Sequence, residues 1–280
     1  MPRVAVIGVG RMGGPIADHL VAAGHEVRVY DVDPQAVHAR VARGAIAAAS
    51  PSDAARAADF VSIVVFDDAQ VLDVVAGPDG VMGTLAPGAI VAVHTTATLA
   101  TVDALARLGA QSGVAVIDAG VSGGEDGARA GTLVTMVGGE PVTVARARPV
   151  LLAFSKEVLY AGPLGAGMAL KLLRNATFYA VMTAIHEAMR IGRLADLDLQ
   201  LIEHTLAVTG ALTQATATFA LGGPEPLADD APEQQRTAME HLDRLARKDL
   251  DALCALSTAI GADMPVFEAT RAEFRRVARL

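Results

Sequence analysis

Short runs rich in valine and isoleucine alternate with alanine-rich stretches of helical length from Val4 to about Gly162. Near-continuous apolar runs of this kind are typical of parallel strands that are buried between two layers of helices. The pattern predicts strands at 4–8, 26–31, 60–66, 89–94, 114–119, 133–137 and 158–160. This part of the chain is therefore expected to form a doubly wound α/β domain.

The strand pattern ends after the Gly-Pro-Leu-Gly sequence at 162–165, and the positions beyond it have helical spacing. One long helix is expected from about 166 to 195, followed by shorter helices that end near residue 280. Glycine, proline and aspartate interrupt the pattern at 221–233, where we expect an exposed loop. The predicted domains are an α/β domain over 1–163 and an all-α domain over 164–280, joined by the long helix.

The composition supplies a large core, because 52% of the 280 residues are hydrophobic and only 19% are charged. The apolar runs have the length of strands or are broken by charges, as at 176–185, which Arg174 precedes and Glu187 follows. We therefore expect no membrane span. The chain enters its first strand pattern at once, without the features of a signal peptide, so a cytoplasmic protein is expected.

Charge and metal-binding residue types narrow the class of ligand. The formal net charge is -8 and the chain has no cluster of lysine and arginine, which argues against nucleic acid as a partner. The seven histidines show no metal-ligand spacing, so no metal is expected. The one cysteine, Cys254, lies in an apolar helical stretch and is interpreted as a packed thiol. Small molecules are the expected ligands.

A G-x-G-x-x-G element follows the first expected strand and leads into a helical pattern. Gly8 permits a tight turn, Gly10 lets the backbone approach a pyrophosphate, and Gly13 lets the helix pack against the strand. A glycine-rich turn without a ligand is the alternative, but the position between a buried strand and an amphipathic helix favours dinucleotide binding. The motif predicts a Rossmann-type domain whose cofactor-binding residues are Gly8, Gly10, Arg11, Met12 and Gly13.

Asp31 ends the second expected strand, about twenty residues beyond the glycines. A carboxylate at that position accepts hydrogen bonds from the adenosine ribose hydroxyls and repels a 2'-phosphate. Asp31 is therefore expected to bind the cofactor and to favour NAD. Arg28 and Arg11 leave cationic character nearby, which keeps NADP possible.

Three segments resemble the β-hydroxyacid dehydrogenase family, and the resemblance covers nearly the whole chain. The first is the glycine motif, which carries Met12 and Pro15 at the family's positions. The second segment is 118–139 and the third is 165–175. The family includes enzymes similar to 3-hydroxyisobutyrate dehydrogenase, tartronate semialdehyde reductase and the glyoxylate/succinic semialdehyde reductases. The resemblance implies reversible hydride transfer between NAD and a small hydroxy acid or its aldehyde.

In the family the second segment binds the substrate carboxylate, so the resemblance assigns that role to Ser122, Gly123 and Gly124. The chemistry agrees, since a hydroxyl and consecutive glycine N–H groups at a strand end form a small concave anion site. A glycine-rich hairpin without function is the alternative. It does not explain Ser122 at the carboxyl end of a strand, where open α/β sheets bind ligands.

The third segment resembles the family's G-x-G-x-x-x-K-x-x-N-N element, which makes Lys171 and Asn175 the expected catalytic residues. They share one helix face with Gly167, which is expected to leave room for cofactor or substrate. Beside a positively charged nicotinamide, the pKa of Lys171 is expected to fall toward the working pH, which suits acid–base catalysis. A lysine that extends to solvent is the alternative.

Weaker matches complete the expected site. Thr96 resembles the second residue of the family's Ser-Thr pair, near the nicotinamide and the substrate; a helix cap is its alternative. Lys248 resembles the lysine of the family's Lys-Asp-Leu element, which closes over the cofactor, with a solvated charge as its alternative. His241 stands where the family often has a phenylalanine against the substrate, and Arg174 replaces the first asparagine of the family's pair.

Two further departures are Gly120 and Thr98, which stand where the family usually has proline, so both loops are expected to be more flexible than in relatives. Imine reduction is an alternative activity, but Lys171 argues against it because imine reductases carry an acidic or tyrosyl residue there. A non-catalytic dinucleotide-binding protein is the other alternative. Relatives pack the all-α domain against a second subunit, so the resemblance implies a homodimer or homotetramer.

Overall fold

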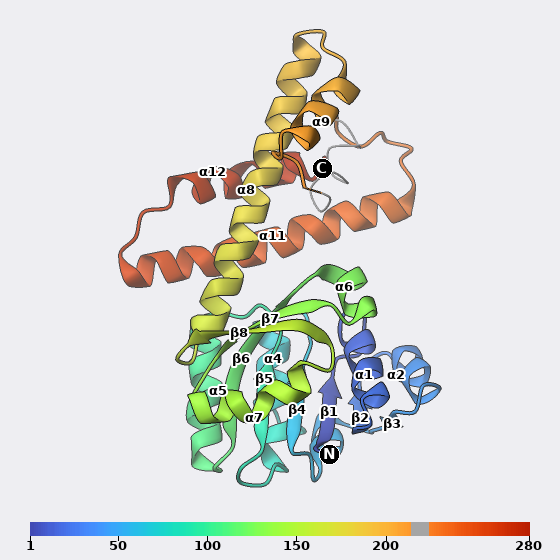
Figure 1. Ribbon diagram of the computed structural model, residues 1–280, viewed down its shortest axis with the longest axis vertical. Coiled ribbons are helices and arrows are strands. Elements are labelled where there is room, and N and C mark those ends of the chain that lie inside the picture. Colours follow the sequence, from blue (N-terminus) through green and yellow to red (C-terminus); the bar gives the residue numbers. More distant parts are fainter. Residues whose placement is uncertain (214–223) are drawn as a thin grey trace. The chain divides into compact units, whose positions relative to one another are not determined.

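The computed structural model describes residues 1–213 and 224–280. The chain forms two compact units, residues 1–171 and 172–280, which are described separately below (Figure 1). The first unit carries the sheet, and the described part of the second unit consists of helices and the turns between them. The expected fold class is confirmed, whereas the domain boundary between residues 163 and 164 stays a prediction.

Residues 1–171 form an eight-stranded sheet in the order β3-β2-β1-β4-β5-β6-β7-β8. All neighbouring strands pair in parallel except β6 and β7, which are antiparallel. The order over the first six strands is the doubly wound order in which dinucleotides bind at the carboxyl ends of the strands. The strands are β1 Arg3–Ile7, β2 Glu26–Tyr30, β3 Ile46–Ala47, β4 Phe60–Ile63, β5 Ile90–Val93, β6 Ala115–Ser122, β7 Leu133–Gly138 and β8 Ser155–Gly162.

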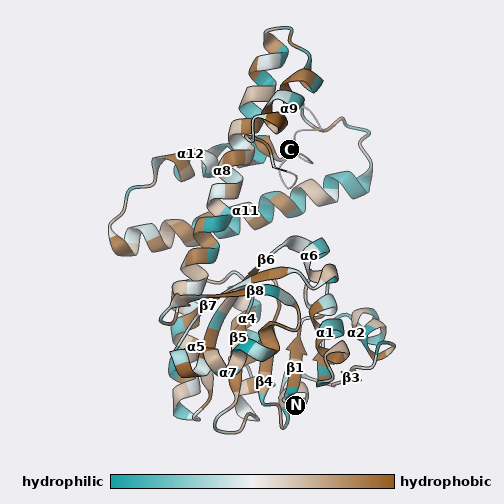
Figure 2. Cartoon of the chain, viewed as in Figure 1, coloured by the Kyte–Doolittle hydropathy of each residue, from teal (hydrophilic) through white to brown (hydrophobic). Residues whose placement is uncertain are grey.

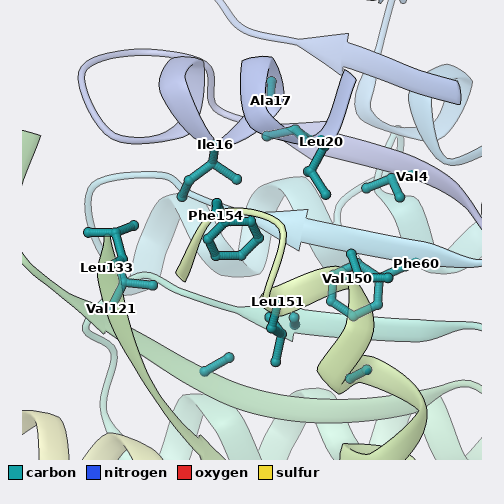
Figure 3. Close-up of a cluster of buried hydrophobic side chains, with 14 of the residues drawn as sticks. Val4, Ile16, Ala17, Leu20, Phe60, Val121, Leu133, Val150, Leu151 and Phe154 are labelled. Atoms are coloured by element: carbon teal, nitrogen blue, oxygen red, sulfur yellow. The ribbon is translucent and has the colours of Figure 1, made fainter. Parts of the chain in front are cut away.

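Helices cover both faces of this sheet (Figure 1). Alternate residues of β1 show the two faces, because Val4 and Val6 belong to one buried cluster while Ala5 and Ile7 belong to another. Figure 3 shows members of the first cluster, among them Leu20 and Phe154. The helical elements are α1 Gly13–Ala22, α2 Pro34–Val41, α3 Pro51–Ala55, α4 Asp68–Ala76, η1 Val81–Gly83, α5 Leu99–Gln111, α6 Gly124–Ala130 and α7 Pro141–Leu151.

The second unit packs around α8 Ala166–Leu194, whose first turns belong to the first unit. Leu172, Ala176 and Tyr179 line one side of α8, at helical spacing, and pack with Leu250 and Phe274. The other helices are α9 Leu199–Val208, α11 Glu233–Ile260 and α12 Pro265–Val277.

The loop expected at 221–233 is only partly described. Residues 221–223 lie outside the described part, and residues 224–232 form neither helix nor strand before α11 begins at Glu233. No helix among the described residues is both long and apolar enough to cross a membrane.

Candidate active site

The glycine motif connects β1 to α1, and its glycines meet different surroundings. Gly8 has a φ of +86°, and a β-carbon there would collide with the carbonyl group of Val64. A β-carbon on Gly13 would collide with the carbonyl oxygen of Gly8. A β-carbon on Gly10 would meet nothing within 4 Å, so the space beside that backbone is open. These contacts fit a pyrophosphate at Gly10, while Gly8 and Gly13 are required by packing.

The start of α1 supplies the complementary charge. Its N-cap residue, Met12, makes no side-chain capping hydrogen bond to the first turn. N–H groups at a helix start attract anions when no side chain caps them. The motif therefore fits the phosphates of a dinucleotide in both space and charge.

Asp31 follows β2 and is bonded to the glycine loop. Its carboxylate accepts the N–H of Val9 at 2.7 Å and that of Asp33 at 2.9 Å. The two arginines considered at this site both have carboxylate partners. Arg28 pairs with Asp53 at 3.1 Å, and Arg11 donates through Nε to Glu125 of α6 at 2.7 Å. These ion pairs reduce the cationic character available for a 2'-phosphate, which sharpens the expected preference for NAD.

Strand β6 holds the start of α8 through Asp118. This fully buried carboxylate accepts the N–H of Gly165 at 2.7 Å and that of Met168 at 2.6 Å. Burial raises the pKa of the Asp118 carboxyl, and these backbone hydrogen bonds oppose that rise. In the sequence Asp118 is only the first residue of the segment 118–139, and its capping role depends on a contact between segments 47 residues apart.

Lys171 is buried, with 8% of its surface exposed, and its stem lies against Gly120 of β6. A β-carbon on Gly120 would lie 2.9 Å from both Cβ and Cγ of Lys171. Gly120 is thus not in a loop, as the sequence suggested, but inside β6 and paired with Met136. The alternative of a lysine extended to solvent is wrong.

The expected role of Gly167 is also wrong. A β-carbon on Gly167 would lie 2.6 Å from the amide nitrogen of Gly138 and from the carbonyl oxygen of Met136, both in β7. Gly167 therefore lets α8 approach β7, and the space beside it holds protein backbone rather than a ligand.

Ser122 is the last residue of β6, and Gly123 and Gly124, the other two residues of the expected carboxylate site, follow it. Gly123 and Gly124 have φ values of +137° and +63°, a region of backbone conformation that favours glycine. A β-carbon on Gly124 would meet nothing within 4 Å. The three residues of the expected carboxylate site thus lie together at a strand end, with open space beside Gly124.

Thr96 lies half-buried just beyond β5, three residues before α5 begins at Leu99. It is not the helix cap, because the N-cap of α5 is Thr98, whose hydroxyl accepts the N–H of Thr101. Thr98 also donates its own N–H to Asp68 at 2.9 Å, a bond that proline cannot make.

In the second unit, Asn175 and Lys248 meet at one buried carboxylate, that of Asp249. Asn175 donates through Nδ2 to Asp249 at 2.7 Å, and Tyr179 donates its hydroxyl at 3.0 Å. Lys248 Nζ lies 3.2 Å from the other carboxylate oxygen, an ion pair by distance rather than a well-aligned hydrogen bond. Burial raises the pKa of Tyr179, and the charge of Asp249 adds to this.

Asp249 and Tyr179 were missed in the sequence. Asp249 belongs to the quoted Lys-Asp-Leu element, and Tyr179 lies one helical turn beyond Asn175, so both had a signal. Arg174 donates to Asn175 Oδ1 at 3.1 Å and lies over the ring of Phe178.

Two further expectations concern the helices of the second unit. His241 lies half-buried in α11. Cys254 is also half-buried in α11, and this burial raises the pKa of its thiol. Within residues 1–213 and 224–280, no group of three or more His, Cys, Asp or Glu side chains could hold a metal ion.

The fold and the glycine loop together define a dinucleotide-binding protein. A family model for the NAD binding domain of 6-phosphogluconate dehydrogenase matches residues 3–162. An uncharacterized oxidoreductase of Mycobacterium tuberculosis is 35% identical over 272 residues, which cover 95% of this chain and 89% of that protein. An NAD-dependent L-serine dehydrogenase of Pseudomonas aeruginosa is 31% identical over 267 residues, with 95% and 89% covered.

A solved structure extends the similarity to the whole fold. The 3-hydroxyisobutyrate dehydrogenase of Mycobacterium tuberculosis with L-serine matches with a TM-score of 0.82 and 28% identity, covering 99% of this chain and 94% of that one. The chain belongs to the β-hydroxyacid dehydrogenase family. It is an NAD(P)-dependent oxidoreductase that acts on a hydroxyl group.

Proposed function

We propose that this enzyme interconverts a small β-hydroxy acid and its aldehyde, with Lys171 as the acid–base group and Ser122, Gly123 and Gly124 as the carboxylate site. The main support is the arrangement on β6. Side chains alternate along a strand, so Gly120, which contacts Lys171, and Ser122 lie on one face, about 7 Å apart. That spacing suits a substrate whose hydroxyl and carboxylate are separated by a few bonds.

NAD supplies the hydride acceptor when it is bound, and the chain's own residues handle the proton. In oxidation, the neutral amine of Lys171 accepts the hydroxyl proton, and in reduction its ammonium returns a proton to the aldehyde oxygen. The burial of Lys171 supports this role, because its stem packs against β6 rather than extending into solvent.

The other residues have supporting roles in this proposal. Asn175 orients the substrate oxygen, and Asp249 fixes the Asn175 amide by accepting its N–H. Thr96 and Lys248 bind the cofactor, with Thr96 also near the substrate, and His241 lines the substrate side. The enzyme is proposed to be cytoplasmic and to work as a homodimer or homotetramer, with NAD preferred over NADP.

Replacement of Lys171 tests the proposal. Lys171→Ala should lower kcat for oxidation of small hydroxy acids by several orders of magnitude while NADH binding, followed by cofactor fluorescence, stays nearly intact. Lys156→Ala, which removes an exposed lysine from β8, is the matched control and should keep normal kcat. Near-normal turnover in Lys171→Ala would contradict the proposal.

The substrate panel separates the alternatives. It should contain L-serine, 3-hydroxyisobutyrate and related aldehydes, assayed with both NAD and NADP. Turnover of cyclic imines without turnover of hydroxy acids would favour imine reduction instead. Tight NADH binding without turnover of any of these compounds would favour a non-catalytic dinucleotide-binding protein.

A further inference from the structure

Gly120 of β6 and the stem of Lys171 of α8 are in direct contact. The three heavy atoms nearest to a β-carbon on Gly120 all belong to Lys171: Cβ and Cγ at 2.9 Å and Cδ at 3.7 Å. Real β-carbons essentially never approach other atoms more closely than 3.0 Å. Any side chain on residue 120 is therefore incompatible with the present position of the lysine stem.

The start of α8 has little freedom to move away from β6. Asp118, two residues before Gly120 on the same strand face, accepts the N–H groups of Gly165 and Met168. Gly167 of α8 also lies directly against the backbone of β7, the strand next to β6. Because these contacts hold the first turn of the helix, a β-carbon on residue 120 would displace the lysine stem itself or strain the helix start.

We propose that Gly120 is a positioning residue for the reaction: its bare α-carbon seats the stem of Lys171 and so sets where the amine lies relative to Ser122. The proposal rests on the proposed function of Lys171. On this proposal, one face of β6 carries three roles in order. Asp118 caps α8, Gly120 seats the stem of Lys171, and Ser122 belongs to the carboxylate site.

Gly120→Ala is the direct test, because alanine adds one β-carbon and Gly120 has no positive φ that would strain it. A misplacement of about 1 Å costs about 100-fold in rate, so kcat should fall by about that factor. The KM for NAD should stay unchanged, and the pH profile of kcat should move because the amine has a new environment.

Gly83→Ala is the matched control. Gly83 is in the same unit, has no positive φ, and a β-carbon on it would meet nothing within 4 Å. It should leave kcat and its pH profile unchanged. A Gly120→Ala enzyme that matches Gly83→Ala in both measurements would overturn the proposal.

A double-variant cycle with Lys171→Gly shows whether the effect passes through the lysine. Lys171→Gly removes both atoms that lie 2.9 Å away, so Gly120→Ala should cause no further loss of the residual turnover and a smaller drop in Tm than in the wild type. Equal losses in the two backgrounds would overturn the proposal. If Gly120→Ala alone does not fold, recovery of folded protein in the double variant supports the seat, and continued failure overturns it.

The two proposals fail in different ways. Normal turnover in Lys171→Ala removes the acid–base role of the lysine. If Lys171→Ala is inactive while Gly120→Ala is fully active, the acid–base role of Lys171 stands and only the positioning role of Gly120 is contradicted.

Discussion

His94 lies just after β5 and connects three neighbouring strands through its buried imidazole. Nδ1 lies 2.7 Å from the carbonyl oxygen of Ala119, which can only accept, so Nδ1 carries the proton. Nε2 then accepts from the hydroxyl of Ser62 at 3.1 Å. Burial lowers the pKa of His94 to about 4, because a charged imidazole would lose its hydration there.

This histidine should make the fold sensitive to acid. The unfolded chain binds a proton at His94 below about pH 6.5, whereas the folded chain does not until about pH 4. The free energy of unfolding should therefore decrease by about 3 kcal/mol as the pH falls from about 6.5 to about 4. Urea unfolding between pH 7 and pH 4 measures this. His94→Gln keeps a donor and an acceptor without titrating, and its slope should be shallower. The raised pKa of Asp118 acts in the opposite direction in both proteins. Equal slopes would contradict the assignment.

Individual residues show which parts of the site can be predicted from the sequence and which depend on the fold. Gly8, Gly13 and Lys171 are recognisable because their spacing is local to one turn or one helix. Gly167 was misinterpreted because its neighbour, Gly138, is 29 residues away in sequence and joins it only through the fold of β7. A glycine in a motif shows that a side chain is excluded, but not whether backbone or ligand excludes it.

At the scale of elements, the start of α5 shows how a departure from the family is compensated. Asp68 Oδ1 accepts the N–H and hydroxyl of Thr98, each at 2.9 Å, and the hydroxyl of Thr101 at 2.5 Å. Thr98→Pro keeps a suitable φ, since Thr98 has a φ of -71°, but removes both of the Thr98 donors and the cap. It should destabilise the protein by about 1–2 kcal/mol in urea unfolding.

Thr98→Ser is the matched control, because it retains the N–H and the hydroxyl and should stay within about 0.5 kcal/mol of the wild type. A Thr98→Pro protein at least as stable as the wild type would mean that the cluster at Asp68 contributes nothing.

Element types followed well from the pattern of the sequence, and their ends followed less well. The long helix was expected at 166–195 and is Ala166–Leu194. Strand β6 was expected to stop at Ala119, but it continues to Ser122 because β7 pairs with it in the antiparallel direction. Strand β3, with two residues, was too short to produce an alternating pattern.

At the scale of the whole molecule, the second unit exposes large apolar side chains that its own core does not cover. Ile191 and Leu194 of α8 are 67% and 78% exposed, and further exposed apolar residues of this unit are Leu201, Val208, Ile260 and Val266. Figure 2 shows hydrophobic segments along α8 and α9. Apolar surface of this kind favours association between subunits.

We therefore expect light scattering after size exclusion to give two or four times the chain mass of 28.7 kDa. Ile191→Glu should shift the protein toward the monomer, since a charge buried in an interface loses its hydration. Leu152→Glu, at a position of the first unit that is 43% exposed, is the control and should keep the wild-type mass. A wild-type protein that has the mass of one chain at micromolar concentration would show that these side chains face solvent, and the homo-oligomer inferred from relatives would not apply to this enzyme.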